Sequence, residues 1–295
     1  MIDVVDSTVI TLKQNSKVFK LRIAAAITLC AIAGMAITPG VSLPSWKIAV
    51  LAVAVFLSSA GASAFNQHFE RDLDAQMPRT RNRPFVTGAL HAGPIWLAAL
   101  GLNLAFAVGV SAWVLNADVA LYIFLGAFVY GVIYTIWLKR LSVWNIVVGG
   151  LAGSFAVLAG AAAITPDLAP APVILALVLF LWTPPHFWSL AIVLHKDYAA
   201  AGVPMLPVVI GDAATAWIIL GHTIALVVLS LLPLAFGMGF IYLAGAMAGG
   251  GFFIWRSIEL IRHPGPKAAR SNFYASFVQL GLLLVTAIAD GSLNL

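Results

Sequence analysis

The sequence predicts an all-α integral membrane protein with nine transmembrane helices. Of its 295 residues, 62% are hydrophobic and only 9% are charged, which leaves too few polar residues to cover a soluble domain of this size. The apolar residues form stretches of roughly 20 residues, the length at which a helix crosses a hydrocarbon core of about 30 Å. The predicted spans are residues 21–38, 48–68, 94–115, 119–138, 145–164, 172–194, 214–233, 237–256 and 273–291.

The basic residues predict the orientation of these spans, because Lys and Arg are retained on the cytoplasmic side. With nine spans and the N-terminus inside, fifteen of the sixteen Lys and Arg residues fall inside and only Lys47 falls outside. The net charge of +5 is then a topology signal that needs no nucleic acid partner. We expect a cytoplasmic segment at 1–20, a single transmembrane domain at 21–295, and the C-terminus outside.

A dense polar segment, residues 66–84, interrupts the apolar sequence after the second span. Asn66, Glu70 and Asp74 recur every fourth residue, so a helix would stack their oxygens along one face. Magnesium prefers such oxygen ligands together with substrate phosphates, and arginine forks suit phosphate charge. The arginines that follow are Arg79, Arg81 and Arg83. The segment predicts a magnesium-bridged phosphate ester site, against the alternative of a polar helix end that merely emerges into water.

A second segment, residues 182–207, combines intramembrane prolines with polar residues. Pro184 and Pro185 interrupt the hydrogen-bond ladder of the sixth span, which is tolerated where the freed backbone groups face protein or a wet cavity. We therefore expect a cavity there. After this span, the residues expected at the inner membrane face, level with Glu70, are His195, Lys196, Asp197 and Tyr198.

These motifs resemble the intramembrane prenyltransferase superfamily, whose first signature is Asn-x-x-x-Asp-x-x-x-Asp, here with Glu70 at the middle position. More narrowly, they resemble its heme-farnesylating branch. The motifs behind that resemblance are Met-Pro-Arg-Thr-Arg-Asn-Arg-Pro (77–84), Trp-Asn-Ile (144–146), Trp-Thr-Pro-Pro-His (182–186), Lys-Asp-Tyr (196–198) and Pro-Met-Leu-Pro (204–207). The chain departs from that branch at Leu21, where a Lys-Pro-Arg motif has proline, and after Gly150, where paired prolines are absent.

The resemblance implies transfer of a farnesyl group from farnesyl diphosphate to a vinyl group of heme b, with Mg²⁺ as cofactor. The metal ligands and catalytic residues would be Asn66, Glu70, Asp74 and Asp197. The diphosphate would meet Arg79, Arg81, Arg83 and Lys196. The implied location is the bacterial inner membrane, with a heme A synthase or a terminal-oxidase assembly factor as candidate partner.

The acceptor would lie among histidines and aromatic side chains. His186 is an intramembrane polar residue, and such residues are costly and often functional. We expect it to contact heme through iron or a propionate, with a structural hydrogen bond as the alternative, and the further acceptor candidates are His68, Trp182 and Tyr198. An allylic cation requires a dry aromatic chamber, and the candidates to line it are Phe65, Phe69, Tyr134, Trp182, Phe187 and Trp188.

Two other functions stay open from sequence. One is prenylation of a quinone precursor or a chlorophyll-type ring, for which bound heme would be absent. The other is secondary transport, because intramembrane prolines and polar groups near the midplane also mark transport sites. Here the charges gather at the inner ends of the spans, which favours a lipid-like substrate inside the bundle.

The uneven distribution of Lys and Arg between the two sides of the membrane predicts a topology that can be tested. Reporter fusions or cysteine labelling should place residues near 80, 140, 205 and 265 inside and the C-terminus outside. Labelling of the 69–93 connection from the outer face would contradict both the topology and an inward-facing site.

Overall fold

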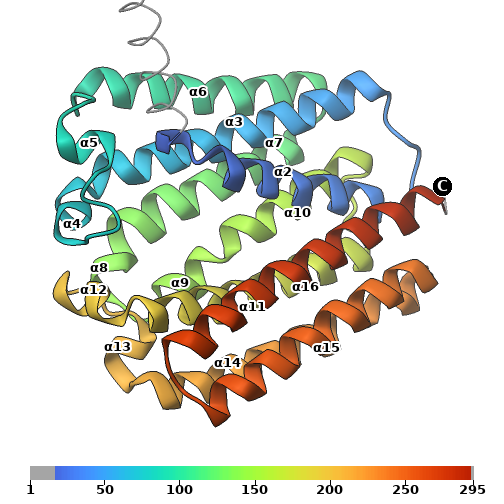
Figure 1. Ribbon diagram of the computed structural model, residues 1–295. Coiled ribbons are helices and arrows are strands. Elements are labelled where there is room, and N and C mark those ends of the chain that lie inside the picture. Colours follow the sequence, from blue (N-terminus) through green and yellow to red (C-terminus); the bar gives the residue numbers. More distant parts are fainter. Residues whose placement is uncertain (1–16, 294–295) are drawn as a thin grey trace, which may run out of the picture.

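The computed structural model describes residues 17–293, and within this range every regular element is helical (Figure 1). The all-α prediction is therefore confirmed. Most of the predicted segment 1–20, including Lys13, lies outside the described residues. The long helices are α2 (Leu21–Ala36), α3 (Ser45–Phe69), α6 (Pro94–Val114), α7 (Ala117–Phe128), α10 (Leu151–Ile164), α11 (Pro170–Val193), α14 (Asp212–Leu229), α15 (Phe240–Arg262) and α16 (Pro266–Leu293).

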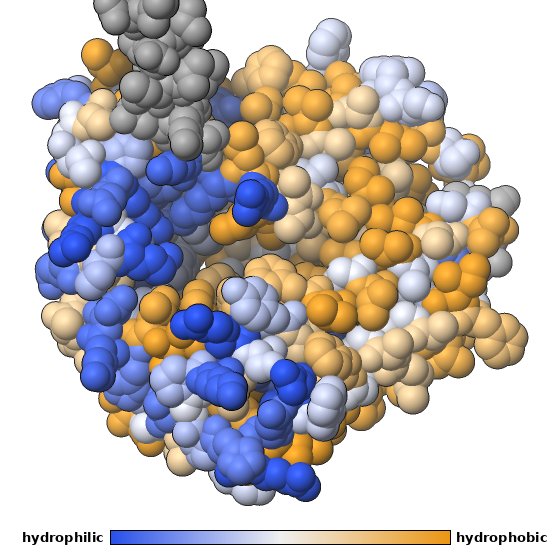
Figure 2. Space-filling view, viewed as in Figure 1, coloured by the Kyte–Doolittle hydropathy of each residue, from blue (hydrophilic) through white to orange (hydrophobic). Residues whose placement is uncertain are grey.

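Short helices join the long ones and gather mostly at one end of the bundle, opposite the C-terminus (Figure 1). They are α4 (Arg71–Gln76), α5 (Pro84–Thr87), α8 (Lys139–Leu141), α9 (Asn145–Gly149), α12 (His195–Ala200) and α13 (Leu206–Ile210). Figure 2 shows that hydrophilic residues cover this end and surround a hollow, whereas the rest of the visible face is largely apolar. The distribution of polarity matches a bundle that stands in a membrane with one wet end.

Helices occur at each of the nine predicted ranges, but the described residues contain only seven helical segments long and apolar enough to cross a membrane. Three of the seven are composite, because a π-helix, η1 (Val129–Leu138), continues α7, α9 leads into α10, and a 3₁₀ helix, η2 (Leu232–Phe236), extends α14. The two others differ: α2 has 16 residues, and in α15 glycines and Arg256 dilute the apolar composition. The count of nine crossings and the orientation remain predictions.

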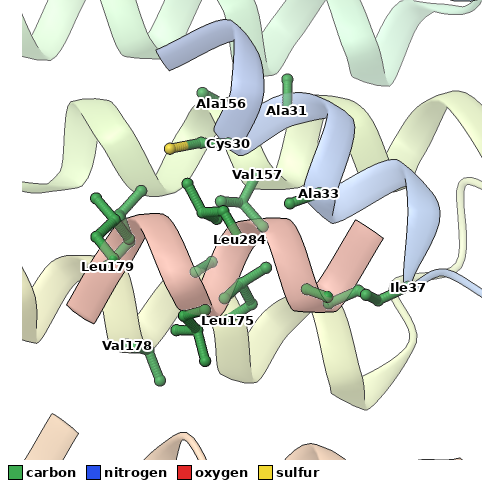
Figure 3. Packing of buried hydrophobic residues seen from close by; sticks show 14 of the residues in the cluster. Cys30, Ala31, Ala33, Ile37, Ala156, Val157, Leu175, Val178, Leu179 and Leu284 are labelled. Atoms are coloured by element: carbon green, nitrogen blue, oxygen red, sulfur yellow. The ribbon is translucent and has the colours of Figure 1, made fainter. Parts of the chain in front are cut away.

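Helix α2 packs against α3, α10 and α16. Figure 3 shows its buried side chains, including the free Cys30, against Val157 of α10, Leu175 of α11 and Leu284 of α16. Small residues allow the close approach that membrane helices need. A Cβ on Gly160 would lie 1.8 Å from the Ala31 carbonyl oxygen, and one on Gly291 would lie 2.1 Å from that of Ala36. Both contacts are with backbone, which cannot move aside.

The close approach of Gly160 to the Ala31 carbonyl predicts that Gly160→Ala destabilises the fold by at least about 2 kcal/mol, because the backbone of α2 cannot move aside for the added methyl group. The matched control is Gly109→Ala in α6, where an added Cβ would meet nothing within 4 Å. Thermal unfolding in detergent should show a lower midpoint for Gly160→Ala alone. Equal midpoints for the two variants would mean that α2 and α10 are less closely packed than described.

Candidate active site

Three predicted site residues lie where α3 gives way to α4. The single helix expected through Asp74 is interrupted: α3 ends at Phe69, Glu70 has φ −90° and ψ 14°, and α4 begins at Arg71. Hydrogen bonds from Glu70 N to Asn66 O (2.9 Å) and from Asp74 N to Glu70 O (2.8 Å) nevertheless preserve the helical spacing. The side chains do not emerge into water, because Asn66, Glu70 and Asp74 are 3%, 0% and 4% exposed.

The buried carboxylates are paired with cations from other parts of the chain. Glu70 contacts the Lys139 ammonium from α8, and Asp74 Oδ2 lies 2.6 Å from Arg83 Nη1. The second Glu70 oxygen, Oε1, is buried and has no hydrogen-bond partner among residues 17–293. Such an orphaned anionic oxygen is costly and indicates a site prepared for a positive ligand.

A third ion pair lies at the surface beside these two. Arg140 of α8 donates two hydrogen bonds of 2.7 Å to the Asp72 carboxylate, whose side chain is 56% exposed. These hydrogen bonds lower the pKa of Asp72. Asp72 therefore helps to join α4 to α8, while the buried carboxylates of the same segment face inward.

Asn66 connects the carboxylates to two further elements. Its Nδ2 donates to Thr135 Oγ1 at 3.1 Å, and its Oδ1 accepts from Lys20 Nζ at 3.3 Å. Thr135 belongs to η1 and donates in turn to the Tyr130 carbonyl, five residues earlier. π-Helical turns are rare and frequent at functional sites. This one aligns Tyr130, Tyr134 and Thr135 with Lys139 at the end of the same span, with the Lys139 ammonium 5.7 Å from the centre of the Tyr134 ring.

Of the three arginines that follow α4, the structure draws one into the site. Arg83 is partly buried and paired with Asp74, whereas Arg79 and Arg81 are exposed. Thr80 lies between them, fully enclosed, and its hydroxyl donates to the Asp74 carbonyl at 2.9 Å. The predicted contact of all three arginines with a diphosphate remains a prediction, with Arg83 the best placed.

The second polar segment packs against the first. Tyr198 and Met205 share a buried apolar cluster with Leu73 and Met77 of the first segment, so the two predicted clusters do meet. Asp197 is half-buried and Lys196 is exposed. Within residues 17–293, however, no group of three His, Cys, Asp or Glu side chains is assembled for a metal. A shared ion between Asp197 and Glu70 stays a prediction.

His186 belongs to α11, and its side chain packs against α16. Its ring is stacked on Trp182 of α11 (centroids 4.2 Å apart) and on Phe273 of α16 (4.5 Å). Its Nδ1 lies 2.7 Å from Ser276 Oγ, and the Ser276 hydroxyl donates its proton to the Phe273 carbonyl at 2.6 Å. Since a hydroxyl has one proton, a Ser276 that donates to the Phe273 carbonyl accepts from His186 Nδ1–H. In that arrangement His186 is the Nδ1–H tautomer, and Nε2 keeps its lone pair.

Of the other acceptor candidates, Trp182 adjoins His186 and His68 lies elsewhere. His68 is edge-on to Phe85 of α5, and its Nε2 has no hydrogen-bond partner within residues 17–293. Trp182 Nε1 donates to the Ser276 carbonyl at 2.9 Å. Trp188, a candidate for the aromatic chamber, packs in a different apolar core with Ile219.

Two apolar cavities adjoin the site, and most of the aromatic side chains expected around an allylic cation do not line them. A cavity of about 100 Å³ lies between α2, α3, α7 and α10, and one of about 410 Å³ lies between α3, α6 and α7. The smaller begins at Ser63 and Tyr130, one turn from Asn66 and Tyr134. Of the six predicted aromatics, only Phe65 lines either cavity. Trp182 packs against Phe277 of α16 and Phe187 against the buried cluster of Tyr198, and the aromatic chamber for an allylic cation stays a prediction.

Charge pattern and spacing alone do not mark Lys20, Thr135 and Lys139 as residues of the site. Lys20 and Lys139 are indistinguishable from other basic residues at the inner ends of spans, and Thr135 lies within an apolar run. Burial, with the nearby charges of Arg83 and Lys139, lowers the pKa of Lys20 to about 7, against the opposing effect of Glu70 and Asp74. Spatial proximity, which only the fold supplies, brings these residues to the carboxylates.

Comparison with known proteins accords with this geometry. The model of the UbiA prenyltransferase family matches residues 27–281. "Protoheme IX farnesyltransferase 2" of Paramagnetospirillum magneticum is 57% identical over 280 residues, covering 95% of this chain and 97% of that protein. "Protoheme IX farnesyltransferase 1" of the same organism is 45% identical, covering 95% and 99%.

Solved structures share the fold at low identity. A structure of digeranylgeranylglyceryl phosphate synthase has a TM-score of 0.79 at 18% identity, covering 95% of this chain and 98% of that one. A UbiA homolog from Archaeoglobus fulgidus, bound to GPP and Mg²⁺, has a TM-score of 0.66 at 15% identity, covering 94% and 99%. The family match over most of the sequence and the relatives that align along nearly their whole length lead to one assignment: the chain belongs to the UbiA prenyltransferase family.

Proposed function

We propose that this protein transfers a farnesyl group from farnesyl diphosphate to a vinyl group of heme b. The observation that carries the proposal is the 57% identity to a protoheme IX farnesyltransferase along 95% of the chain. The buried carboxylate pair at the wet end of the bundle supports it, because that site suits an ester of diphosphate.

The reaction breaks the allylic C–O bond of farnesyl diphosphate, and the electron pair leaves with the diphosphate. The vinyl π electrons of the heme then form the new C–C bond. The cation left beside the porphyrin ring takes up water and loses a proton, which gives a hydroxyethylfarnesyl group. No covalent enzyme intermediate is needed, so the protein must stabilise the departing charge and exclude stray water.

The residues of the site fit Mg²⁺. Carboxylate and amide oxygens are its preferred protein ligands, and Glu70 Oε1 is an orphaned anionic oxygen. Asn66, Glu70 and Asp74 would hold the metal, with Asp197 on a second ion. When bound, the metal would neutralise charge on the leaving diphosphate.

The ion pairs explain how the site can stay charge-balanced before substrate arrives. Lys139 compensates Glu70, and Arg83 compensates Asp74. With a diphosphate and its metal bound, each carboxylate would pair with the metal and each cation with a phosphate oxygen, so that no buried charge would be left alone. The same side chains would then serve both the empty site and the loaded site.

The acceptor is proposed to lie against α11 and α16, with His186 Nε2 as a ligand to heme iron. Stacking of the imidazole between Trp182 and Phe273 fixes the plane of the ring, and Ser276 fixes its tautomer. A neutral imidazole with a free Nε2 is the form that binds iron. Prenylation of a quinone precursor would need no such ligand.

The cellular setting is also proposed. Nine crossings with the active site facing the cytoplasm would place the short helices of Figure 1 at the inner surface of a bacterial inner membrane. A heme A synthase or an oxidase assembly factor would be the recipient of the product.

The function is tested with purified protein, farnesyl diphosphate, Mg²⁺ and heme b, and mass spectrometry should detect heme that carries the added hydroxyethylfarnesyl group. Glu70→Gln, Asp74→Asn and Asp197→Asn should each lower turnover per folded protein by about 100-fold or more, because each loses an anionic metal ligand. Asp72→Asn is the matched control, since Asp72 is exposed and its carboxylate pairs, in the part of the chain that the structure describes, only with Arg140. If the losses of turnover caused by Glu70→Gln and Asp197→Asn add in the double variant, Asp197 is not a ligand of the same metal site.

Heme binding tests the acceptor. His186→Ala should abolish the absorption change on titration with heme b and leave farnesyl diphosphate affinity unchanged, because Nε2 belongs to the acceptor side alone. Ser276→Ala should shift the spectrum and weaken heme binding less, since the imidazole then loses its tautomer restraint. If His186→Ala leaves the heme spectra unchanged, His186 does not bind heme iron and its role is structural.

A further inference from the structure

The turn between α15 and α16 carries positive charge without an acidic residue to balance it. We call residues 262–270 the basic turn. Helix α15 ends at Arg262 and α16 begins at Pro266, and the sequence has no Asp or Glu from 260 to 289. The exposed basic side chains of the turn are Arg262, His263, Lys267 and Arg270. Three full positive charges and a histidine are thus gathered at one end of the helix pair.

The cations of the basic turn differ from the paired cations elsewhere at the wet end. At the candidate active site and beside it, three cations each pair with a carboxylate. Arg256, just before the turn, pairs with Glu259. The side chains of Arg262, Lys267 and Arg270 have no ion pair or hydrogen bond within residues 17–293. Like charges held close together repel one another, so an anion that joins them is stabilised.

The exposed face of α16 changes from charged to aromatic to apolar along the helix. Lys267, Arg270, Tyr274 and Val278 follow one another at spacings of three or four residues, so they share one face. Tyr274 is 60% exposed and Val278 is 45% exposed. This order matches a membrane surface, where cations meet headgroups, tyrosine lies at the interface and apolar side chains meet the hydrocarbon.

Helix α15 shows the same order in the opposite direction. Trp255 is 58% exposed and lies seven residues before Arg262, on the same face of the helix. Ser257 Oγ donates to Asn272 Oδ1 at 3.0 Å, so Trp255 and Tyr274, two residues beyond this contact on each helix, lie at one level. At about 1.5 Å per residue, Arg262 lies about 10 Å beyond that level, a separation comparable with the thickness of the headgroup region.

We propose that the basic turn binds the phosphate of an anionic phospholipid, whose acyl chains lie along the exposed faces of α15 and α16. The occupant is a lipid because aromatic and apolar side chains continue both charged faces towards the middle of the bundle. A turn that only specified topology would need the charges but not the aromatic pair at a common level. The basic turn lies at the foot of the view in Figure 1, apart from α4 and α8 of the candidate active site.

A lipid bound there would hold α15 and α16 together at their wet ends. Helix α16 also carries Phe273 and Ser276, which contact His186 of α11. The lipid would therefore stabilise a helix that borders the proposed acceptor side, without contact with the reacting groups.

The test measures lipid binding to the full-length protein by native mass spectrometry, with phosphatidylglycerol and phosphatidylcholine titrated in parallel. The parent should bind phosphatidylglycerol about tenfold or more tightly than phosphatidylcholine, because each basic side chain near an anionic headgroup contributes about fivefold. The triple variant Arg262→Gln, Lys267→Gln, Arg270→Gln should lose this preference. The control variant, Arg22→Gln with Lys47→Gln, removes cations outside the turn and should keep it.

Single variants keep the test decisive if the triple variant does not fold. Arg262→Gln, Lys267→Gln and Arg270→Gln should each weaken phosphatidylglycerol binding by about fivefold and leave phosphatidylcholine binding unchanged. If the parent binds the two lipids equally, or if the variants keep the parent's preference, the basic turn is no lipid site. Its charge then serves topology or an acidic protein partner.

Thermal unfolding in lipid nanodiscs separates a lipid from a free anion. The parent should unfold at a higher temperature in discs that contain phosphatidylglycerol than in discs of phosphatidylcholine alone, and high salt should reduce the difference because it screens exposed charges. Soluble glycerol phosphate should not replace the lipid. If glycerol phosphate raises the unfolding temperature as much as phosphatidylglycerol does, the turn binds a free phosphate and the lipid proposal fails.

Discussion

The structure depends on the burial of two carboxylates, Glu70 and Asp74, at the wet end of an otherwise apolar bundle. Charges in such a place must be compensated, and the chain supplies the cations from segments far apart in sequence. Lys139 arrives at the end of a π-helical turn, and Arg83 arrives from the loop that follows α4. The compensation therefore ties α3, α4 and α8 together before any ligand binds.

The interior of the bundle has the opposite character. Helix α2 approaches α10 and α16 so closely that Gly160 and Gly291 have no room for a side chain, and its buried residues are almost all small or apolar (Figure 3). Close packing of small residues is how membrane helices associate without a hydrophobic driving force between them. It fixes the C-terminal half of α2, while Lys20, which precedes the N-terminus of this helix, contacts Asn66 on α3.

Composition and periodicity were enough to predict the helical class and the ranges of the helices, because apolar runs of span length have few other solutions. The carboxylate face was also predictable from the fourth-residue spacing of Asn66, Glu70 and Asp74. The break of the helix at Glu70 was not, because it accompanies ion pairs with distant residues: Lys139 is 69 positions from Glu70, and Arg83 is 9 positions from Asp74. Lys20 and Lys139 look like topology signals in the sequence, and only the fold shows that their side chains enter the site.

The most direct test of the central claim is a double-mutant cycle on Glu70 and Lys139, measured as the free energy of unfolding of the ligand-free protein in detergent. Glu70→Gln and Lys139→Met should each destabilise by about 3 kcal/mol, since each leaves its partner buried without its counter-charge. The double variant should be clearly more stable than the sum of the two losses predicts, yet should no longer bind farnesyl diphosphate. Strictly additive losses would mean that the two charges do not compensate each other, and would contradict the exchange of partners on which the proposed mechanism depends.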